Sequence, residues 1–169
     1  MNKIVVVAFK KTGKTTLVNK LLQVTKRDVC GYQTVKVQDN SIKNSPLYLC
    51  PIGEKLIPSE ENHVGYCGGG KHEVKLDVFN TKAVALITPK NKETLIIMDE
   101  VGFMEQDADI FKNKVFEVLK SPNPVLIMLK DKPNIKFLED IKKFETIKLI
   151  KMNKDNRDEV FEIVKNSLT

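Results

Sequence analysis

The sequence predicts an α/β fold in which a mostly parallel β-sheet is flanked by helices. Short apolar runs occur within residues 4–9, 94–100 and 124–130, and stretches with helical spacing of apolar residues lie between them. Continuous apolar runs are typical of strands buried on both faces, and strands that alternate with helices are typical of parallel sheets. Because 169 residues is a usual length for one domain, we expect residues 1–169 to form a single domain.

The first strand and the first helix are expected on either side of a glycine-containing loop. Residues 4–9 are continuously apolar and predict a buried strand. From Thr15 the spacing changes, because apolar residues recur four positions apart at 17 and 21 and at 18 and 22. Residues with this spacing share one helix face, so we expect a helix from about Thr15.

Residues 29–88 differ in character from the rest of the chain. They hold six of the eight glycines, two short alternating stretches at residues 32–37 and 74–80, and turn signals at residues 44–46 and 67–72. Alternation predicts half-buried strands, and the glycine and proline residues predict turns. We therefore expect antiparallel hairpins inserted after the first helix, and not a second domain.

The second half of the chain continues the alternation of strands and helices. Residues 94–100 predict a buried strand that ends in two acids, and further strands are expected at residues 124–130 and 146–152. Helical spacing predicts helices between and after these strands, with apolar faces at Phe111, Val115, Val118 and Leu119, within residues 135–144, and at Val160, Phe161, Val164 and Leu168. Asn156 and Glu159 have the spacing of a capping box for the last helix.

Composition narrows the classes of partner. The net charge of +6 comes almost entirely from lysine, since Arg27 and Arg157 are the only arginines. Nucleic-acid surfaces more often use arginines interleaved with aromatic residues, and these lysines are dispersed among acids. We expect a solvated lysine-rich surface with no clear nucleic-acid site, whose excess charge helps to attract a polyphosphate.

The sequence also bears on localisation. It has no run of about 18 apolar residues that could span a bilayer, and its first apolar run leads directly into the glycine loop rather than into a signal-cleavage site. The three cysteines contain no CxxC pair, so no disulfide framework is expected. We therefore expect a cytoplasmic protein that does not interact with a membrane.

Residues 8–16 have the outline of a phosphate-binding loop, with Ala8 in place of the usual first glycine. In such a loop, backbone N–H groups point at the phosphates and the next helix adds its dipole. Gly13 takes the tightest position, Lys14 reaches the β- and γ-phosphates, and the Thr15 hydroxyl binds Mg²⁺. Alanine is compatible with the first position if its φ is negative. The expected nucleotide-binding residues of the loop are Ala8, Phe9, Lys10, Lys11, Thr12, Gly13, Lys14, Thr15 and Thr16.

Two adjacent acids end the second buried strand. Asp99 is in the position that holds Mg²⁺ through water, opposite Thr15. Glu100 is in a position to orient and partly deprotonate a water for in-line attack on the γ-phosphate. Switch GTPases generally lack this adjacent acid. The pair therefore favours hydrolysis, with Glu100 and Lys14 as the catalytic residues and Asp99 and Thr15 at the metal.

The segments GKTTLV, GYQTVKV, IIMDEVGFME and NRDEV, in this order, resemble the THEP-type nucleoside-triphosphatase family of P-loop NTPases, which includes the human cancer-related nucleoside triphosphatase. The specific part is DEVGFME at residues 99–105 together with NRDE at residues 156–159. The resemblance implies a monomeric hydrolase of broad specificity for nucleoside triphosphates such as ATP and GTP, with Mg²⁺ as cofactor and slow turnover. It places the phosphates on residues 13–16, the metal at Thr15 and Asp99, and the water-activating acid at Glu100.

The chain departs from this family in the first loop position, Ala8, and after the third buried strand. Many relatives carry a histidine or arginine pair there, whereas residues 130–132 are Lys-Asp-Lys. A lysine supplies charge but no bidentate fork. The cation that stabilises the transition state is therefore open between Lys130, Lys11 and Arg157. Arg157 is equally compatible with a base or phosphate contact and with a solvated position at a helix start.

Several weaker features are left open or excluded. Glu105 is either a second acid behind the site or a residue at the start of a helix, and the glycines at 68–70 are compatible with a mobile lid over the nucleotide. The residues His63, Cys67, His72 and Cys50 match no common zinc-ligand spacing, so no zinc site is expected. Residues 153–156 (NKDN) lack the aspartate of a guanine-reading motif, so guanine specificity does not follow.

Two rivals to hydrolysis remain. A nucleotide or small-molecule kinase would use a hydroxyl acceptor in place of water, but such kinases usually clamp phosphates with several arginines from a lid, and residues 29–88 contain none. A non-catalytic regulatory module would keep nucleotide affinity through the loop. Phosphate release with and without acceptors separates the first two activities, and binding without turnover would indicate the third.

Overall fold

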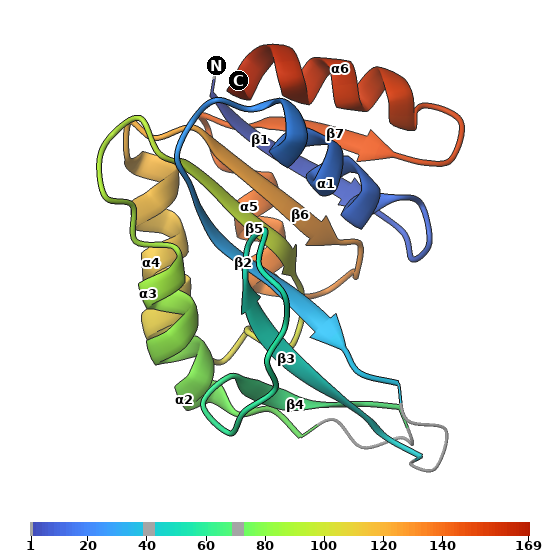
Figure 1. The fold of residues 1–169 in the computed structure, drawn as a ribbon, viewed down its shortest axis with the longest axis vertical. Coiled ribbons are helices and arrows are strands. Elements are labelled where there is room, and N and C mark those ends of the chain that lie inside the picture. Colours follow the sequence, from blue (N-terminus) through green and yellow to red (C-terminus); the bar gives the residue numbers. More distant parts are fainter. Residues whose placement is uncertain (1, 39–42, 69–72) are drawn as a thin grey trace.

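The computed structural model describes residues 2–38, 43–68 and 73–169. Its centre is a seven-stranded sheet in the order β4-β3-β2-β5-β6-β1-β7 (Figure 1). The pairs β2–β5, β5–β6, β6–β1 and β1–β7 are parallel, and β3 and β4 extend the sheet in antiparallel fashion. The strands are β1 (Lys3–Ala8), β2 (Val29–Lys36), β3 (Ser45–Pro51), β4 (His63–Cys67), β5 (Leu95–Val101), β6 (Val125–Lys130) and β7 (Lys148–Met152). The predicted α/β fold with a mostly parallel sheet is confirmed.

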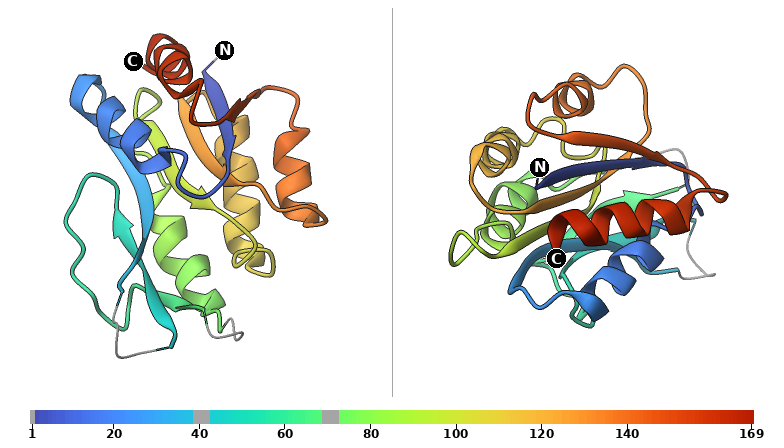
Figure 2. Two further views of the ribbon diagram at one scale, coloured as in Figure 1. Left: turned by 90° about the vertical axis from the view of Figure 1, so that its right-hand side faces the viewer. Right: turned by 90° about the horizontal axis from the view of Figure 1, so that it is seen from above.

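Helices cover both faces of this sheet, as the alternation of strands and helices predicts (Figure 2). Helices α1 and α6 contact each other on one face, and α3, η1 and α4 form a second contacting group. The helices are α1 (Lys14–Val24), α4 (Asp109–Lys120), α5 (Lys136–Lys142) and α6 (Arg157–Leu168), and a continuous helical segment joins α2 (Leu76–Val78), η1 (Phe79–Ala83) and α3 (Val84–Leu86). The termini lie close together at the α6 end of the fold (Figure 1).

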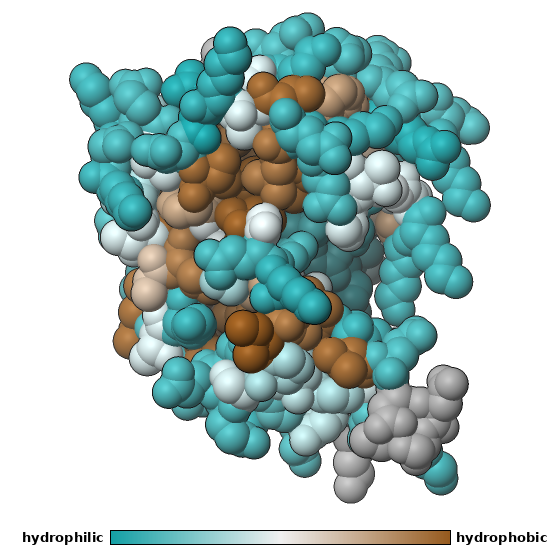
Figure 3. Space-filling view, viewed as in Figure 1, coloured by the Kyte–Doolittle hydropathy of each residue, from teal (hydrophilic) through white to brown (hydrophobic). Residues whose placement is uncertain are grey.

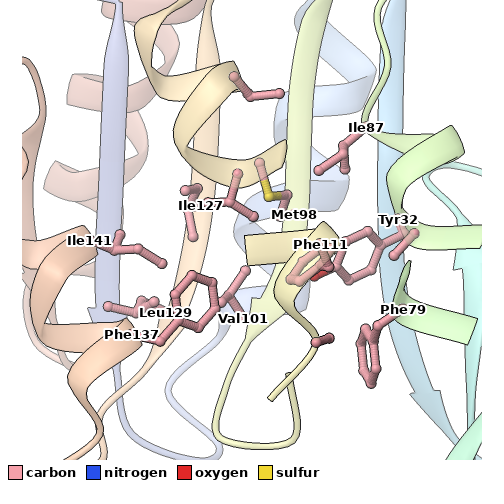
Figure 4. Close-up of a cluster of buried hydrophobic side chains, with 14 of the residues drawn as sticks. Tyr32, Phe79, Ile87, Met98, Val101, Phe111, Ile127, Leu129, Phe137 and Ile141 are labelled. Carbon is pink, nitrogen blue, oxygen red and sulfur yellow. The ribbon is translucent and has the colours of Figure 1, made fainter. Parts of the chain in front are cut away.

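Two apolar cores lie on the two faces of the sheet. Alternate residues of one strand enter different cores: Val5 and Val7 join the larger one, and Ile4 and Val6 join the smaller one with α1 and α6. Figure 4 shows part of the larger core, where Phe111 of α4 lies between side chains from the sheet and from the neighbouring helices. Strands with both faces buried explain why the central strands read as continuous apolar runs.

The region predicted as inserted antiparallel hairpins differs from that prediction in two respects. Strand β2 pairs antiparallel with β3 but also parallel with β5, so it belongs to the main sheet. Residues 74–80 were expected to alternate as a strand, yet residues 76–86 are helical. Phe79 and Ala83 are four positions apart and both buried, which is a helical spacing. The alternating apolar residues before Phe79 have the period of a strand, and for this reason the sequence did not predict the helix.

The predicted capping box at the start of α6 is wrong. Asn156 is the residue before α6, but its side chain makes no capping hydrogen bond to the helix. Its Oδ1 instead accepts the backbone N–H of Asn153 at 2.8 Å, and its Nδ2 donates to the carbonyl of Lys151 at 3.0 Å. Asn156 therefore fixes the turn between β7 and α6, in a way that the spacing of the box did not predict.

The surface is mostly hydrophilic, with an apolar area near the centre of the face shown in Figure 3. A recess bordered by hydrophilic side chains lies to the right of that area in the same view. None of the helices in the described part of the chain is long and apolar enough to cross a bilayer.

Candidate active site

The loop between β1 and α1 is wound around two residues with positive φ. Gly13 has φ 100° directly before α1, and Lys11 has φ 61°, which is unusual for a residue with a side chain. The Thr12 hydroxyl donates a 2.8 Å hydrogen bond to the carbonyl of Phe9 and closes the turn. Ala8 is not among the described residues with positive φ, so alanine fits at the first position as expected. The loop brings the N-terminus of α1 to the carboxyl edge of the sheet, where it favours an anion.

Asp99 and Glu100 lie at the same edge, at the end of β5. The pairing of β5 with β6 shifts register between Asp99 and Val101, so Glu100 is an extra residue in the strand. Such bulges re-aim side chains and are frequent beside active sites. Burial, reinforced by the charge of Glu100, raises the pKa of Asp99 to about 6, and Lys14 acts in the opposite direction.

An ion pair connects the loop to these acids. The Nζ of Lys14 donates to the Oε2 of Glu100, and the Nζ of Lys130 lies 3.9 Å from its Oε1. Lys130 is the last residue of β6, the strand between β5 and β1, so the sheet order delivers all three groups to one point. Glu100 is therefore a carboxylate between two lysines.

The donor set at this point fits Mg²⁺. The Asp99 carboxylate is 7% exposed, carries the adjacent charge of Glu100, and receives no side-chain hydrogen bond from the described residues. The exposed Thr15 hydroxyl likewise has no hydrogen-bond partner within residues 2–38, 43–68 and 73–169. A carboxylate and a hydroxyl are hard oxygen donors of the kind that Mg²⁺ prefers, and a cation there would offset the repulsion between the two carboxylates.

A cavity of about 710 Å³ joins these residues. Among the predicted site residues, Lys10, Lys11, Lys14, Thr15, Asp99 and Glu100 line it, whereas Ala8, Phe9, Thr12, Gly13, Thr16 and Arg157 do not. Ala8 is buried in the smaller core, and the Phe9 side chain is 67% exposed. These two positions could reach a phosphate only through their backbone N–H groups.

Arg157 lies beside the loop but outside this cavity. A Cβ on Gly13 would come within 3.8 Å of the Arg157 Cδ, which places the arginine stem against the loop. The neighbouring residue Asp158 lies 3.6 Å from the Nζ of Lys20, so the start of α6 also contacts α1. Arg157 is therefore near the turn that precedes α1, although it does not line the cavity.

Glu105 is buried behind the acids and is not a helix-start residue, since α4 begins only at Asp109. The carboxylate is 3% exposed and its Oε2 accepts the backbone N–H of Gly102 at 3.1 Å. Burial raises the pKa of Glu105 to about 7, although hydrogen bonds from backbone N–H groups act against this rise. Of the two roles left open by the sequence, the structure favours a second acid behind the site.

One lysine ends β6, another follows it, and both pack on an aromatic ring. The Nζ atoms of Lys132 and Lys130 lie 4.0 and 5.1 Å from the ring centroid of Phe103. Such contacts between a cation and a ring hold a lysine at low cost. Phe103 belongs to the segment after β5, so this packing fixes Lys130 relative to Glu100.

The rest of the cavity wall was missed by sequence reasoning. It includes Gln33, Thr34 and Val35 of β2, Leu47 of β3, Cys67 of β4, Phe79 of η1, and Phe103 and Met104 after β5. The segments GYQTVKV at residues 31–37 and DEVGFME at residues 99–105 contain several of them, but neither segment indicated which strand would lie beside β5.

The residues considered for zinc serve other purposes. The Nε2 of His63 lies 3.0 Å from the carbonyl of Gly65, and the Sγ of Cys50 donates to the carbonyl of Glu54 at 3.2 Å. Within the described residues, no group of three His, Cys, Asp or Glu side chains has an arrangement that could hold a metal ion. His72 and the glycines at 69 and 70, and with them the expected lid, lie outside the described residues.

Relatives of known class resemble this chain along nearly its whole length. A family model described as NTPase matches residues 3–165. Nucleoside-triphosphatase THEP1 of Methanocaldococcus jannaschii is 30% identical, over 92% of this chain and 91% of the relative. THEP1 of Aquifex aeolicus is 25% identical over 95% of each chain, and the cancer-related nucleoside-triphosphatase homolog of Mus musculus is 25% identical over 93% of each.

Solved structures share the fold. The crystal structure of THEP1 from Aquifex aeolicus superposes with a TM-score of 0.70 at 22% identity, covering 98% of both chains. The solution structure of a human cancer-related nucleoside triphosphatase gives a TM-score of 0.75 at 19% identity, covering 100% of this chain and 98% of the other. The fold is that of the P-loop NTPases, and the chain belongs to the NTPase family, with the THEP-type nucleoside-triphosphatases as its relatives.

Proposed function

We propose that the protein hydrolyses nucleoside triphosphates, ATP and GTP among them, to the diphosphate and inorganic phosphate with Mg²⁺. The observation that carries this proposal is the contact between Lys14 and Glu100 inside one cavity, because it joins the lysine of a phosphate loop to an acid able to activate water. The names of the relatives support the class of reaction. The roles given below to single residues are part of the proposal.

The loop and α1 hold the phosphates. Backbone N–H groups of the loop and of the N-terminus of α1 donate hydrogen bonds to the phosphate oxygens. Lys14 contacts the β- and γ-phosphates. Thr15 and Asp99 are the residues that would hold Mg²⁺, which when bound neutralises charge on the β- and γ-phosphate oxygens. Lys10 and Lys11 line the same cavity and add positive potential for an incoming polyphosphate.

Glu100 orients the attacking water and accepts its proton. This carboxylate is paired with Lys14. A γ-phosphate competes for the same lysine, so nucleotide binding releases Glu100 for the water. The water oxygen attacks the γ-phosphorus in line with the leaving diphosphate, and the carboxylate is correctly placed if the γ-phosphate lies against Lys14.

Lys130 is our candidate for the cation that stabilises the transition state. It lies 3.9 Å from Glu100, at the end of the strand between the two catalytic segments, and Phe103 supports it. Lys11 also lines the cavity, whereas Arg157 is beside Gly13 at the turn before α1. Arg157 is therefore better placed for the nucleoside or the α-phosphate than for the γ-phosphate.

Phosphate release from ATP, GTP, CTP and UTP tests this function, with Mg²⁺ and with EDTA. We expect Mg²⁺-dependent release from several nucleotides, and a loss of about 10²–10⁴-fold in Glu100→Gln, typical of a missing general base. Glu117→Gln, on an exposed face of α4, is the matched control. Equal turnover in wild type and Glu100→Gln would remove Glu100 from the mechanism, and tight binding with no release would contradict hydrolysis itself.

A further inference from the structure

The cavity extends far beyond the residues that a triphosphate needs. At one end it is lined by Lys10, Lys11, Lys14 and Thr15 of the phosphate loop. The other end is lined by strands β2, β3 and β4, by η1, and by the segment after β5. In the sheet order, β2 lies next to β5 on the side away from β1. The far end is therefore beyond Glu100 as seen from the loop.

The nucleotide's own base and sugar do not fill this far end. In a phosphate loop the lysine contacts the terminal phosphates, and here Lys14 is paired with Glu100. The γ-phosphate of a bound nucleotide would therefore face Glu100 and the far end of the cavity. The nucleoside then extends the opposite way along the loop, toward Gly13 and Arg157. Space for a second small molecule is left on the far side of the γ-phosphate.

The wall of this space combines apolar surface with free hydrogen-bonding groups. Leu47 and Phe79 are buried and Met104 is half-buried. Glu105, only 3% exposed, also lines the cavity, and its carboxylate accepts hydrogen bonds from the backbone N–H groups of Gly102 and of Glu105 itself. The Gln33 Nε2 donates to a backbone carbonyl at 3.3 Å, which leaves the Gln33 carbonyl oxygen without a partner in the described part of the chain. Polar groups of this kind on an otherwise apolar wall can pair with donors and acceptors on the edge of a ligand.

The charges on the wall favour an uncharged ligand. Charges of both signs border the far end, since Glu100 and Glu105 are balanced there by Lys36 and Lys130, and neither of the chain's two arginines lines the cavity. A phosphorylated ligand would require a cationic clamp of the kind that arginine forks provide. An uncharged compound with one apolar ring face, and with donors and acceptors on its edge, fits the wall better.

We propose that the far end of the cavity binds a nucleoside and that one of its hydroxyl groups takes the place of water as the acceptor of the γ-phosphoryl group. This inference rests on the proposed function, since it uses the same phosphates and the same base. The hydroxyl oxygen forms a bond to the γ-phosphorus while the bond from that phosphorus to the β–γ bridging oxygen breaks. The hydroxyl proton passes to Glu100, and the diphosphate leaves with the electron pair of the broken bond.

Nucleoside binding is measured first, by calorimetry on protein saturated with Mg²⁺ and a non-hydrolysable ATP analogue. The probes are adenosine, guanosine, cytidine, uridine and thymidine. We expect at least one to bind saturably, with a Kd below about 1 mM. Cys67→Phe fills the far end and should weaken binding more than tenfold, whereas Cys67→Ser, of nearly unchanged size, should not.

A second variant tests the same site independently, in case Cys67→Phe does not fold. Glu105→Gln keeps an acceptor for the Gly102 N–H but replaces a carboxylate oxygen at the cavity with an amide, and we expect nucleoside binding to weaken about tenfold. Circular dichroism melting confirms that each variant is folded. Absence of saturable binding to wild type, or binding that neither Cys67→Phe nor Glu105→Gln alters, would overturn the assignment.

Transfer is then followed with ATP labelled on its γ-phosphate, with and without the nucleoside that binds. We expect labelled nucleoside monophosphate, and a ratio of this product to inorganic phosphate that falls at least tenfold in the folded cavity variants. Label found only in inorganic phosphate at saturating nucleoside would overturn the acceptor site and leave hydrolysis standing. Intact ATP under all conditions would refute the transfer and the proposed function together.

Discussion

The Nζ of Lys14 and the Oε2 of Glu100 form an ion pair across 86 positions of sequence. One residue begins α1 and the other interrupts the end of β5, and only β6 separates β5 from β1 in the sheet. The opposite charges of the two side chains offset each other at this edge of the sheet. In the proposed mechanism the substrate needs Lys14 and the water needs Glu100, so one event, arrival of the γ-phosphate at Lys14, would prepare both groups for the reaction.

Glu100→Gln should bind nucleotide more tightly than wild type while hydrolysing it poorly. Wild type must give up the ion pair to Lys14 before Lys14 can contact phosphate, and the variant has only a neutral amide there. The pair is partly exposed, so we expect a gain of about 1 kcal/mol, or a factor of about five in Kd. Calorimetric titration with a non-hydrolysable ATP analogue and Mg²⁺ measures it. Lys14→Ala should abolish measurable triphosphate affinity, and weaker binding in Glu100→Gln would show that the ion pair does not oppose the nucleotide.

Lys130→Met and Lys11→Gly distinguish the roles of two of the lysines that line the cavity. If Lys130 is the transition-state cation, Lys130→Met should lower kcat by about 10²-fold with little change in KM. Lys11 has φ 61°, a conformation that glycine adopts without strain, so Lys11→Gly removes the charge while keeping the loop. We expect a change in kcat of less than about threefold in that variant. The reverse order of effects in steady-state kinetics would assign the role to Lys11.

The parts of the fold that the sequence predicted are those whose pattern is decided locally. Strands β1, β5 and β6 are buried on both faces, so each reads as a continuous apolar run whatever its neighbours are. The position of β2 depends on long-range pairing: its half-buried residues suit an antiparallel hairpin and a parallel neighbour equally well. The prediction for residues 76–86 was wrong for a different reason: the three alternating apolar residues before Phe79 have the period of a strand.

The candidate site likewise has a part that local sequence patterns predict and a part that depends on long-range pairing. The nearness of Lys14 to Asp99 and Glu100 could be predicted because Lys14 comes in the loop after one recognisable strand and the two acids end another, and carboxyl ends of parallel strands meet at one edge. The opposite wall of the cavity, with Gln33 and Phe79, comes from segments whose relation to β5 is set only by the order of strands. The ion pair of Lys14 with Glu100 depends on the register shift at Glu100, for which the sequence holds no signal.

Glu105 should make the protein less stable as pH rises. Burial raises its pKa from 4.5 to about 7, so between these values the folded chain holds a proton that the unfolded chain has lost. The free energy of unfolding therefore falls across this interval and levels off above about pH 7, by an amount on the order of 3 kcal/mol. Urea unfolding from pH 4.5 to 8, with EDTA present, measures the slope.

Glu105→Gln isolates this effect, because glutamine keeps the acceptor for the Gly102 N–H and does not titrate. The variant should lose less stability than wild type between pH 5 and 7 and should be the more stable of the two at pH 8. Asp99, whose pKa is also raised, contributes equally to both proteins and cancels in the difference. Parallel stability curves for the two proteins would show that Glu105 does not hold its proton in the folded chain.

Gly31→Ala should be severely destabilising, because β2 passes too close to β5 at this point for any side chain. Gly31 has φ 131°, and a Cβ there would lie 1.8 Å from the carbonyl oxygen of Ile97, an atom of the sheet backbone that cannot move aside. We expect a loss of about 4 kcal/mol or more in urea unfolding, or no soluble protein. Gly53→Ala is the matched control: its φ is 78°, but the nearest atom to its Cβ is a leucine methyl at 3.7 Å, so only the backbone strain of about 1 kcal/mol remains. Equal losses in the two variants would mean that β2 and β5 can separate at Gly31, and would contradict the close parallel pairing that aligns Gln33 with Asp99 at the edge of the site.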